Sequence, residues 1–380
     1  MRYIFYVTYI MKYNPFLITG YKSPEYFCDR EAESARLREA IENQRNITLI
    51  SSRRMGKTGL ILHTFNQLSK DKSRLPIYFD IMGTTGLDEF AEVFSNAVIR
   101  AISRSNNALK GFLKKLAALR PGLSFDPLSG EPRISLDIRN EQDVGLSLNL
   151  LFELIAGEKR SFIVAIDEFQ QISSYPEKNV EAILRSHIQQ ASNMNFIFSG
   201  SKKHMLSEMF SQPSRPFFSS TEMMFLDVID QKSYFEFISS HFAARGKSIQ
   251  EEALDLIAAY TGMHTFYVQF LCNRLFSSYK KVSAREVNDT IHTILRENEA
   301  IYANYLNLLT TTQYRVLRAI AQEGVLENPT SGKFLARHQL GAASTVSQAL
   351  ESLTGKEFIQ NESGRFFLQD KFFAQWIRSK

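Results

Sequence analysis

Residues 47–58 read ITLISSRRMGKT, and this stretch decides the fold. The run at 47–50 is apolar and β-branched, so it predicts a short buried strand. A helical pattern follows the stretch and continues to Leu68. The segment between them is similar to the phosphate-binding loop G-x-x-x-x-G-K-S/T. A strand entering such a loop and a helix leaving it predict a P-loop that binds the phosphates of a nucleotide.

The loop positions carry distinct expected roles. In order, they are Ser51, Ser52, Arg53, Arg54, Met55, Gly56, Lys57 and Thr58, followed by Gly59. Backbone N–H groups would face the phosphates, Lys57 would contact the β- and γ-phosphates, and Thr58 would ligate Mg²⁺. Gly56 lets the backbone approach without a Cβ clash. Ser51 replaces the usual first glycine, and the alternative reading is a chance turn before a helix.

A pair of acids supplies the second half of the expected site. The apolar run 162–166 ends in Asp167 and Glu168. At the carboxyl edge of a parallel sheet, both acids would lie beside the loop. Asp167 is expected to hold Mg²⁺ through water, and Glu168 to activate the attacking water as a general base. The alternative is an aspartate that only caps a helix.

Strands alternating with helices predict an α/β fold, a parallel sheet with helices on both faces. Besides 47–50, the expected strands are 76–81, 161–166, 195–198 and 224–226. Residues 14–46 are polar and mostly helical in pattern, and helical spacing also covers 88–118 and 141–157. Residues 119–139 are rich in turn formers and predict an insertion with a hairpin.

The pattern changes after about residue 230, where the strands are expected to stop. Helices are expected at 233–245, 251–260, 264–279, 284–295 and 297–309, forming an all-α lid. Helices at 313–323, 333–341 and 344–355 precede a hairpin formed by 358–359 and 365–368, which is the plan of a winged helix. The expected division is therefore a tail at 1–13, a core at 14–230, a lid at 231–309 and a winged helix at 310–380.

Composition is that of an ordinary globular protein. The 380 residues are 44% hydrophobic and 22% charged, with a net charge of +5. Two distant cysteines, Cys28 and Cys272, match no metal-binding spacing and favour a reducing, cytoplasmic location. The apolar run at 1–10 is too short to span a bilayer, so no membrane partner is expected. It is interpreted as a tail, with Met11 as an alternative start.

These motifs together resemble the archaeal and bacterial ATPases of the STAND and AAA+ group, with a P-loop core, a helical lid and a C-terminal winged helix. The segments that carry the resemblance are YFCDREAES at 26–34, the loop at 51–58, IDEFQQI at 166–172, FSGS at 198–201 and FLQDKFFAQWI at 367–377. The resemblance implies ATP or ADP with Mg²⁺ as ligands.

The resemblance also implies further site residues. Phe27 and Arg30 would lie near the adenine, and Ser201 would end a sensor strand. Arg215 would act as a finger or sensor for the γ-phosphate, with a solvated loop arginine as the equal alternative. His264 would sense the nucleotide from the lid, although a histidine at a helix start is more often structural.

The winged helix leaves the partner open between DNA and protein. Its expected recognition helix, 344–353, carries no lysine or arginine. Residues 310–380 hold nine basic and six acidic side chains, a small surplus for neutralising phosphates. This favours a regulatory or protein-contact role over DNA binding. Two functions remain in view: an ATPase switch, and a nucleotide-loaded DNA- or protein-binding module with little or no hydrolysis.

Overall fold

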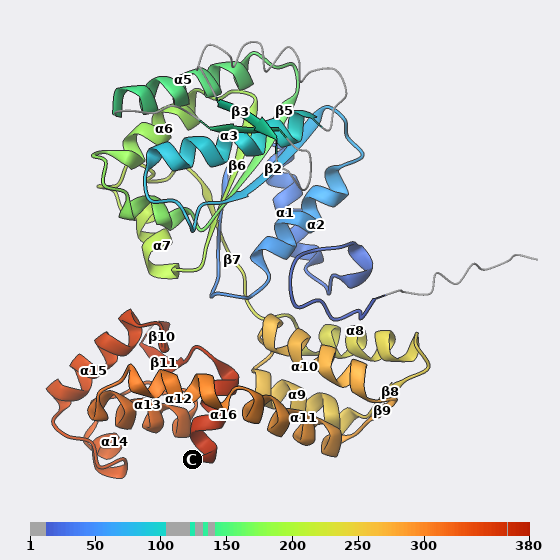
Figure 1. Ribbon diagram of the computed structural model, residues 1–380, viewed down its shortest axis with the longest axis vertical. Coiled ribbons are helices and arrows are strands. Elements are labelled where there is room, and N and C mark those ends of the chain that lie inside the picture. Colours follow the sequence, from blue (N-terminus) through green and yellow to red (C-terminus); the bar gives the residue numbers. More distant parts are fainter. Residues whose placement is uncertain (1–12, 104–121, 126–131, 136–140, 363) are drawn as a thin grey trace, which may run out of the picture. The chain divides into compact units, whose positions relative to one another are not determined.

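Five parallel strands form the central sheet of the protein, seen in a computed structural model (Figure 1). They are β1 (Ile47–Ile50), β2 (Arg74–Asp80), β5 (Ser161–Asp167), β6 (Met194–Gly200) and β7 (Glu222–Phe225). Their order across the sheet is β2-β5-β6-β1-β7, and every neighbouring pair is parallel. The structure describes residues 13–103, 122–125, 132–135, 141–362 and 364–380.

Alternate side chains of the inner strands serve two separate apolar cores. On β5, Phe162, Val164 and Ile166 face one core, whereas Ile163 and Ala165 face the other. The first core is completed by α3 (Leu87–Ser103), α5 (Glu141–Ala156), α6 (Val180–Gln190) and α7 (Lys203–Ser211). The second is completed by α1 (Glu31–Glu42) and α2 (Lys57–Leu68). The predicted α/β fold with helices on both faces is confirmed.

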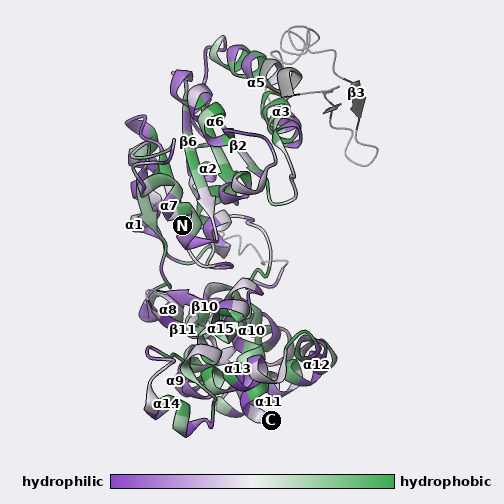
Figure 2. Ribbon diagram, turned by 90° about the vertical axis from the view of Figure 1, so that its left-hand side faces the viewer, coloured by the Kyte–Doolittle hydropathy of each residue, from purple (hydrophilic) through white to green (hydrophobic). Residues whose placement is uncertain are grey.

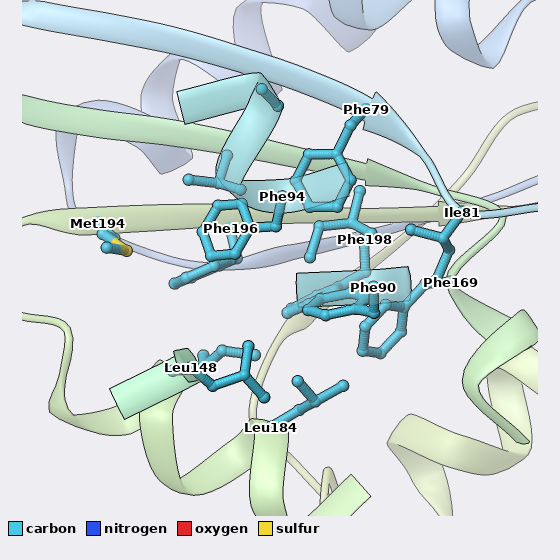
Figure 3. Packing of buried hydrophobic residues seen from close by; sticks show 14 of the residues in the cluster. Phe79, Ile81, Phe90, Phe94, Leu148, Phe169, Leu184, Met194, Phe196 and Phe198 are labelled. Atoms are coloured by element: carbon cyan, nitrogen blue, oxygen red, sulfur yellow. The ribbon is translucent and has the colours of Figure 1, made fainter. Parts of the chain in front are cut away.

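Phenylalanines dominate the first core (Figure 3). The ring of Phe79 on β2 stacks on that of Phe94 on α3, with centroids 5.2 Å apart. Phe169 is the first residue of the short 3-10 helix η3 (Phe169–Ser174). The centroid of its ring lies 4.5 Å from that of Phe198 on β6. Since Phe169 directly follows Glu168, this packing fixes the backbone next to the predicted general base.

The predicted insertion contains the expected hairpin. Strands β3 (Gly122–Phe125) and β4 (Pro132–Ser135) pair antiparallel. The rest of 119–139 lies outside the described residues, as do residues 104–118 of the expected long helix. Residues 14–46, expected to be mostly helical, are helical only in α1 and in the 3-10 turn η1 (Pro24–Tyr26).

The chain divides into two units between Val228 and Ile229. Thr19–Val228 form the sheet unit, and residues 13–18 with 229–380 form the helical unit. The helical unit begins with α8 (Gln231–Ala243), α9 (Glu251–Thr261), α10 (Thr265–Ser278), α11 (Ala284–Glu297) and α12 (Glu299–Asn307). Figure 2 shows hydrophobic and hydrophilic residues alternating around α11, as expected for a helix with one buried face.

The expectation that strands stop after residue 230 is wrong in the lid. Strands β8 (Ser248–Ile249) and β9 (Lys281–Val282) form a short parallel pair. Each has only two residues, too few for an alternating pattern to be read in the sequence.

The last part of the helical unit has the predicted winged-helix elements. They are α13 (Thr311–Glu323), α14 (Gly332–Arg337), α15 (Ala343–Gly355) and the antiparallel strands β10 (Ile359–Glu362) and β11 (Arg365–Leu368). A further helix, α16 (Lys371–Ser379), was not predicted. Asp370 caps α16 by accepting hydrogen bonds from the backbone N–H groups of Phe372 and Phe373. Lys371 therefore occupies the first helical position. Among the described helices, none is both long and apolar enough to cross a membrane.

Residues 14–18 pack in the helical unit, although they were expected in the core. Phe16 is fully buried, and its ring lies 5.7 Å from those of Phe242 and Phe276. Asn273 donates a hydrogen bond to the Phe16 carbonyl, which fixes the segment further. The sequence pattern missed this placement because one buried aromatic residue in a short segment has no periodicity.

Replacing Phe16 by alanine should lower the free energy of unfolding of the helical unit by about 3–5 kcal/mol, because it leaves a cavity the size of a phenyl ring. Urea denaturation followed by circular dichroism would measure this. Ile18→Ala is the matched control, since Ile18 is 39% exposed and should lose far less. Equal losses in the two variants would contradict the burial of Phe16 as the anchor of this segment.

Candidate nucleotide-binding site

The phosphate loop leads directly from β1 into α2. Gly56 precedes the first residue of α2 and has φ of 94°, in the left-handed region that favours glycine. Arg54 is also left-handed, with φ of 65°. Ser51 is fully buried at the end of β1, while Arg53 and Arg54 are exposed. The first N–H groups of α2 therefore lie next to the loop, where an anion would be favoured.

Lys57 is buried among neutral oxygens of the loop. Its Nζ lies 3.3 Å from Ser51 Oγ and 3.4 Å from the carbonyl oxygens of Ser51 and Ser52. Burial lowers the pKa of the ammonium group, and the nearby carboxylates of Glu168 and Asp167 only partly oppose this. Within the described parts of the chain, no carboxylate pairs with it at salt-bridge distance. The buried charge would be better satisfied by an anionic ligand.

Asp167 sits at the meeting point of three strand ends and the loop. The Thr58 hydroxyl, predicted to share a metal with this carboxylate, donates a hydrogen bond of 2.7 Å to Asp167 Oδ2. Tyr78 donates to the same oxygen at 2.9 Å. Ser199 and the backbone N–H of Glu168 donate to Oδ1. These four donors hold the carboxylate in one orientation.

Two of these donors, Tyr78 and Ser199, were not predicted. Burial and the Asp167 charge raise the pKa of Tyr78 well above its usual range, so its hydroxyl remains a donor. A tyrosine near the end of an otherwise apolar strand, and a serine two residues before Ser201, are weak signals in the sequence. Their importance depends on strand register, which pairs Asp80 with Asp167.

Asp80 is a further carboxylate at this edge of the sheet. Burial raises its pKa, and the charges of Asp167 and Glu168 add to this effect. A hydrogen bond of 2.7 Å from the Met82 N–H opposes it. The site thus brings together three acids from two neighbouring strands.

Glu168 lies just beyond β5 in a left-handed backbone conformation, with φ of 55°. Its Oε2 accepts hydrogen bonds from Gln170 Nε2 at 2.6 Å and from Ser201 Oγ at 2.8 Å. The predicted general base and the predicted sensor residue are therefore in direct contact.

Aromatic side chains cover the face of α2 next to the loop. Phe27 stacks on His63 with centroids 4.2 Å apart, and Tyr21 hydrogen-bonds the same imidazole at 3.1 Å. A Cβ at Gly59 would lie 3.5 Å from the Phe27 ring, in ordinary contact. Tyr21 and His63 are part of this cluster and were not predicted. Burial lowers the pKa of His63, which favours the neutral ring.

Arg30 has protein partners. Its guanidinium donates to Glu33 at 2.7 Å and to the carbonyl oxygen of Asp227. Only 5% of the residue is exposed, so it joins the start of α1 to the segment after β7. This buried arrangement explains an arginine and a glutamate three residues apart without invoking a ligand.

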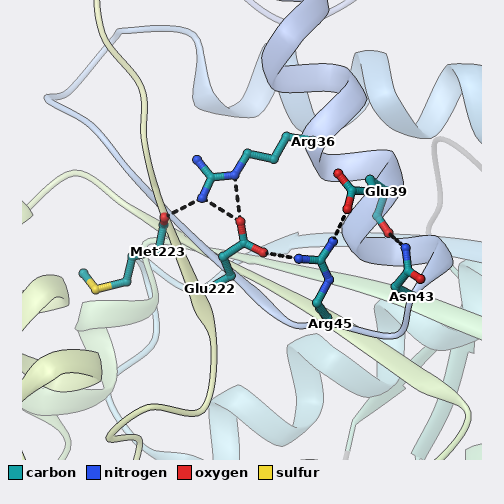
Figure 4. Close-up of polar contacts among 6 residues, drawn as sticks. All are labelled: Arg36, Glu39, Asn43, Arg45, Glu222 and Met223. Atoms are coloured by element: carbon teal, nitrogen blue, oxygen red, sulfur yellow. Dashed lines mark hydrogen bonds and ion pairs between the residues drawn. The ribbon is translucent and has the colours of Figure 1, made fainter.

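A charge cluster holds the same helix to β7 (Figure 4). Glu222, at the start of β7, accepts hydrogen bonds from Arg36 Nε at 2.8 Å and from Arg45 at 2.7 Å. Arg45 also pairs with Glu39. These groups are partly exposed, so the network contributes modestly to stability and mainly orients α1.

Arg215 lies between α7 and β7 and forms an ion pair with Glu181 on α6. Its side chain is 31% exposed. The guanidinium therefore has a partly buried protein partner, while its role toward a γ-phosphate stays a prediction. Burial raises the pKa of Glu181, and Arg215 counteracts that rise.

His264 belongs to the helical unit, whereas the loop and the acids belong to the sheet unit. It precedes α10, and its ring contacts Tyr267 edge-on at 5.1 Å.

Comparison with protein families gives two matches along the chain. Residues 27–269 match a family described as an ATPase domain predominantly from Archaea. Residues 300–379 match one described as "Probable winged helix domain". A search of curated proteins finds no match.

Solved structures share the fold at low sequence identity. The Walker-type ATPase PABY2304 of Pyrococcus abyssi is 19% identical with a TM-score of 0.63, covering 96% of this chain and 99% of its own. The ORC2 protein of Aeropyrum pernix, in ADPNP and ADP complexes, is 15% identical with a TM-score of 0.56, covering 96% and 98%. The ORC1 protein of Aeropyrum pernix in complex with DNA is 14% identical with a TM-score of 0.52, covering 94% of each chain.

The ATPase family match spans more than half of the 380 residues and contains both the phosphate loop and the acid pair. The protein therefore belongs to the family of P-loop ATPases found predominantly in Archaea.

Proposed function

We propose that the protein binds ATP with Mg²⁺, hydrolyses it to ADP and phosphate, and changes conformation as it does so. The observation that carries the proposal is the 2.7 Å contact between Thr58 Oγ1 and Asp167 Oδ2, beside the buried Lys57. A hydroxyl and a carboxylate at this distance are the protein ligands typical of magnesium in nucleotide sites.

The donor chemistry fits Mg²⁺ with phosphate oxygens and water as its other ligands. Across the described residues, no cluster of three or more His, Cys, Asp or Glu side chains could hold a metal by itself. Mg²⁺ commonly uses one or two carboxylates with substrate phosphates, so the single contact pair is suitable. Bound there, the ion would neutralise charge on the β- and γ-phosphates.

Other residues of the chain bind the nucleotide and take part in the hydrolysis. The Ser52–Met55 backbone and the first N–H groups of α2 cradle the phosphates, and the Lys57 ammonium binds the β- and γ-phosphate oxygens. A water attacks the γ-phosphorus, Glu168 accepts its proton, and the bond to the β,γ-bridging oxygen breaks.

Phe27 and Gly59 form the adenine end. Arg215 would leave Glu181 to reach a γ-phosphate, in the same or a neighbouring chain, and His264 would sense the nucleotide.

The alternative is a nucleotide-loaded module whose target is DNA or a protein. The likeness to the ORC1 structure, which is a complex with DNA, keeps DNA in view. The exposed side of α15, however, carries Ser344, Thr345, Ser347 and Gln348 instead of basic residues. Arg337, at the end of α14, is paired with Glu323. This favours a protein partner over DNA.

Steady-state phosphate release tests the hydrolytic form. The wild-type protein should release phosphate from ATP with Mg²⁺, and the release should stop in EDTA. Tight ATP binding without any release would leave the loaded module as the correct account. A gel shift with duplex DNA at low salt would then test the target, and no shift would exclude DNA under those conditions.

A further inference from the structure

The two carboxylate oxygens of Glu168 have different surroundings. Oε2 accepts from Gln170 Nε2 at 2.6 Å, from Ser201 Oγ at 2.8 Å and from the Ser201 backbone N–H at 3.3 Å. No donor from the described part of the chain hydrogen-bonds Oε1. One oxygen is thus fixed by three donors, while the other can still accept a proton.

The side chain of Gln170 makes this contact through its amide nitrogen, and its amide oxygen is left without a hydrogen-bond partner among the described residues. The residue is 3% exposed, and its Oε1 is buried. The amide nitrogen must face Glu168, because an amide oxygen would repel the carboxylate. An unsatisfied buried polar atom destabilises a fold. Stability alone therefore does not account for a glutamine here.

Gly200 makes the arrangement sterically possible. A Cβ built on Gly200 would lie 2.0 Å from Gln170 Oε1, far inside the closest approach that real Cβ atoms show. Its backbone is extended in β6, so conformational freedom is not the reason for glycine. The reason is the space that the Gln170 amide occupies.

We propose that Gln170 is a positioning residue for Glu168, and that Gly200 provides the room it needs. Gln170 and Ser201 hold Oε2, which leaves Oε1 to accept the proton of the attacking water. The inference rests on the proposed hydrolytic function, in which Glu168 is the general base. It adds that a buried amide controls turnover through its hydrogen bond to Glu168.

The test compares Gln170→Leu and Gly200→Ala in the full-length protein, with the affinity for ATP, KM and kcat measured for each. Both variants should lower kcat by about tenfold to a hundredfold, because each removes or displaces a hydrogen bond to a charged group. KM and ATP affinity should stay near wild type. Gln170→Leu should also unfold at the same or a higher urea concentration, since it removes an unsatisfied buried oxygen.

Gln171→Leu is the matched control. Gln171 is the next residue of the same short helix, and its side-chain amide donates to the Thr84 carbonyl at 3.0 Å. Its backbone N–H donates to the Glu168 carbonyl at 2.9 Å, a bond that the substitution leaves in place. It should lose stability but keep kcat. In a Glu168→Gln background, adding Gln170→Leu should cause no further loss of turnover, because the positioned base is already gone.

The outcomes separate this inference from the proposed function. If Glu168→Gln turns over as fast as wild type, the function itself fails. If Glu168→Gln is inactive but Gln170→Leu keeps full kcat, only the positioning role is overturned. An increase in kcat, or a loss of ATP affinity that matches the loss of kcat, would also overturn it.

Discussion

Replacing Lys57 by methionine should abolish ATP binding and yet leave the nucleotide-free protein at least as stable as wild type. The Lys57 charge is buried against neutral oxygens 3.3–3.4 Å away, and burial lowers its pKa. An apolar side chain of similar length removes that cost in the absence of ligand. When ATP binds, the missing cation leaves the phosphate charge unpaired. The free energy of ATP binding should therefore weaken by about 3–5 kcal/mol, which lowers the affinity at least about 100-fold.

Unfolding in urea with and without ATP measures both effects at once. At an ATP concentration of about 100 times the wild-type Kd, the wild-type protein should gain about 2.7 kcal/mol, whereas Lys57→Met should gain at most about 0.4 kcal/mol. Lys70→Met is the control, because Lys70 is exposed just beyond the other end of α2. An unchanged gain in Lys57→Met would mean that the nucleotide binds elsewhere.

Replacing Glu168 by glutamine should lower kcat by about 10²–10⁴-fold, the usual contribution of a general base. The amide is isosteric and can still occupy the site, so affinity for Mg-ATP should change little. Phosphate release gives kcat, and titration with a fluorescent ATP analogue gives the affinity.

Glu153→Gln serves as the matched control, since Glu153 lies exposed on α5. It should behave as wild type in both assays. If Glu168→Gln retained wild-type turnover, another group would have to accept the proton, and Asp80 at the end of the neighbouring strand β2 would be a candidate to examine.

The strand, the loop and the acid pair could be predicted because each has a local signal. A β-branched run before G-K-T and an apolar run before Asp167–Glu168 are readable without any tertiary information. The contact between Thr58 and Asp167 followed from the rule that parallel strands end at one edge.

The supporting residues could not be predicted, because their roles depend on partners distant in sequence. Tyr78 reaches Asp167 across 89 positions, and Ser199 reaches it across 32. Arg215 was expected to act on phosphate or to be solvated, but Glu181 lies within reach only in the folded sheet unit. Phe16 packs its ring against rings of the helical unit, and its own short segment has no sequence pattern that predicts this packing.

A crystal structure of the Glu168→Gln variant with Mg-ATP would show directly whether the nucleotide and the metal bind at the phosphate loop and the acid pair. We expect γ-phosphate oxygens within hydrogen-bond distance of Lys57 Nζ. We also expect Mg²⁺ at about 2.1 Å from Thr58 Oγ1, with Asp167 reached through water. A nucleotide bound away from Ser51–Thr58, or a metal with no link to Thr58 and Asp167, would contradict the proposed nucleotide site.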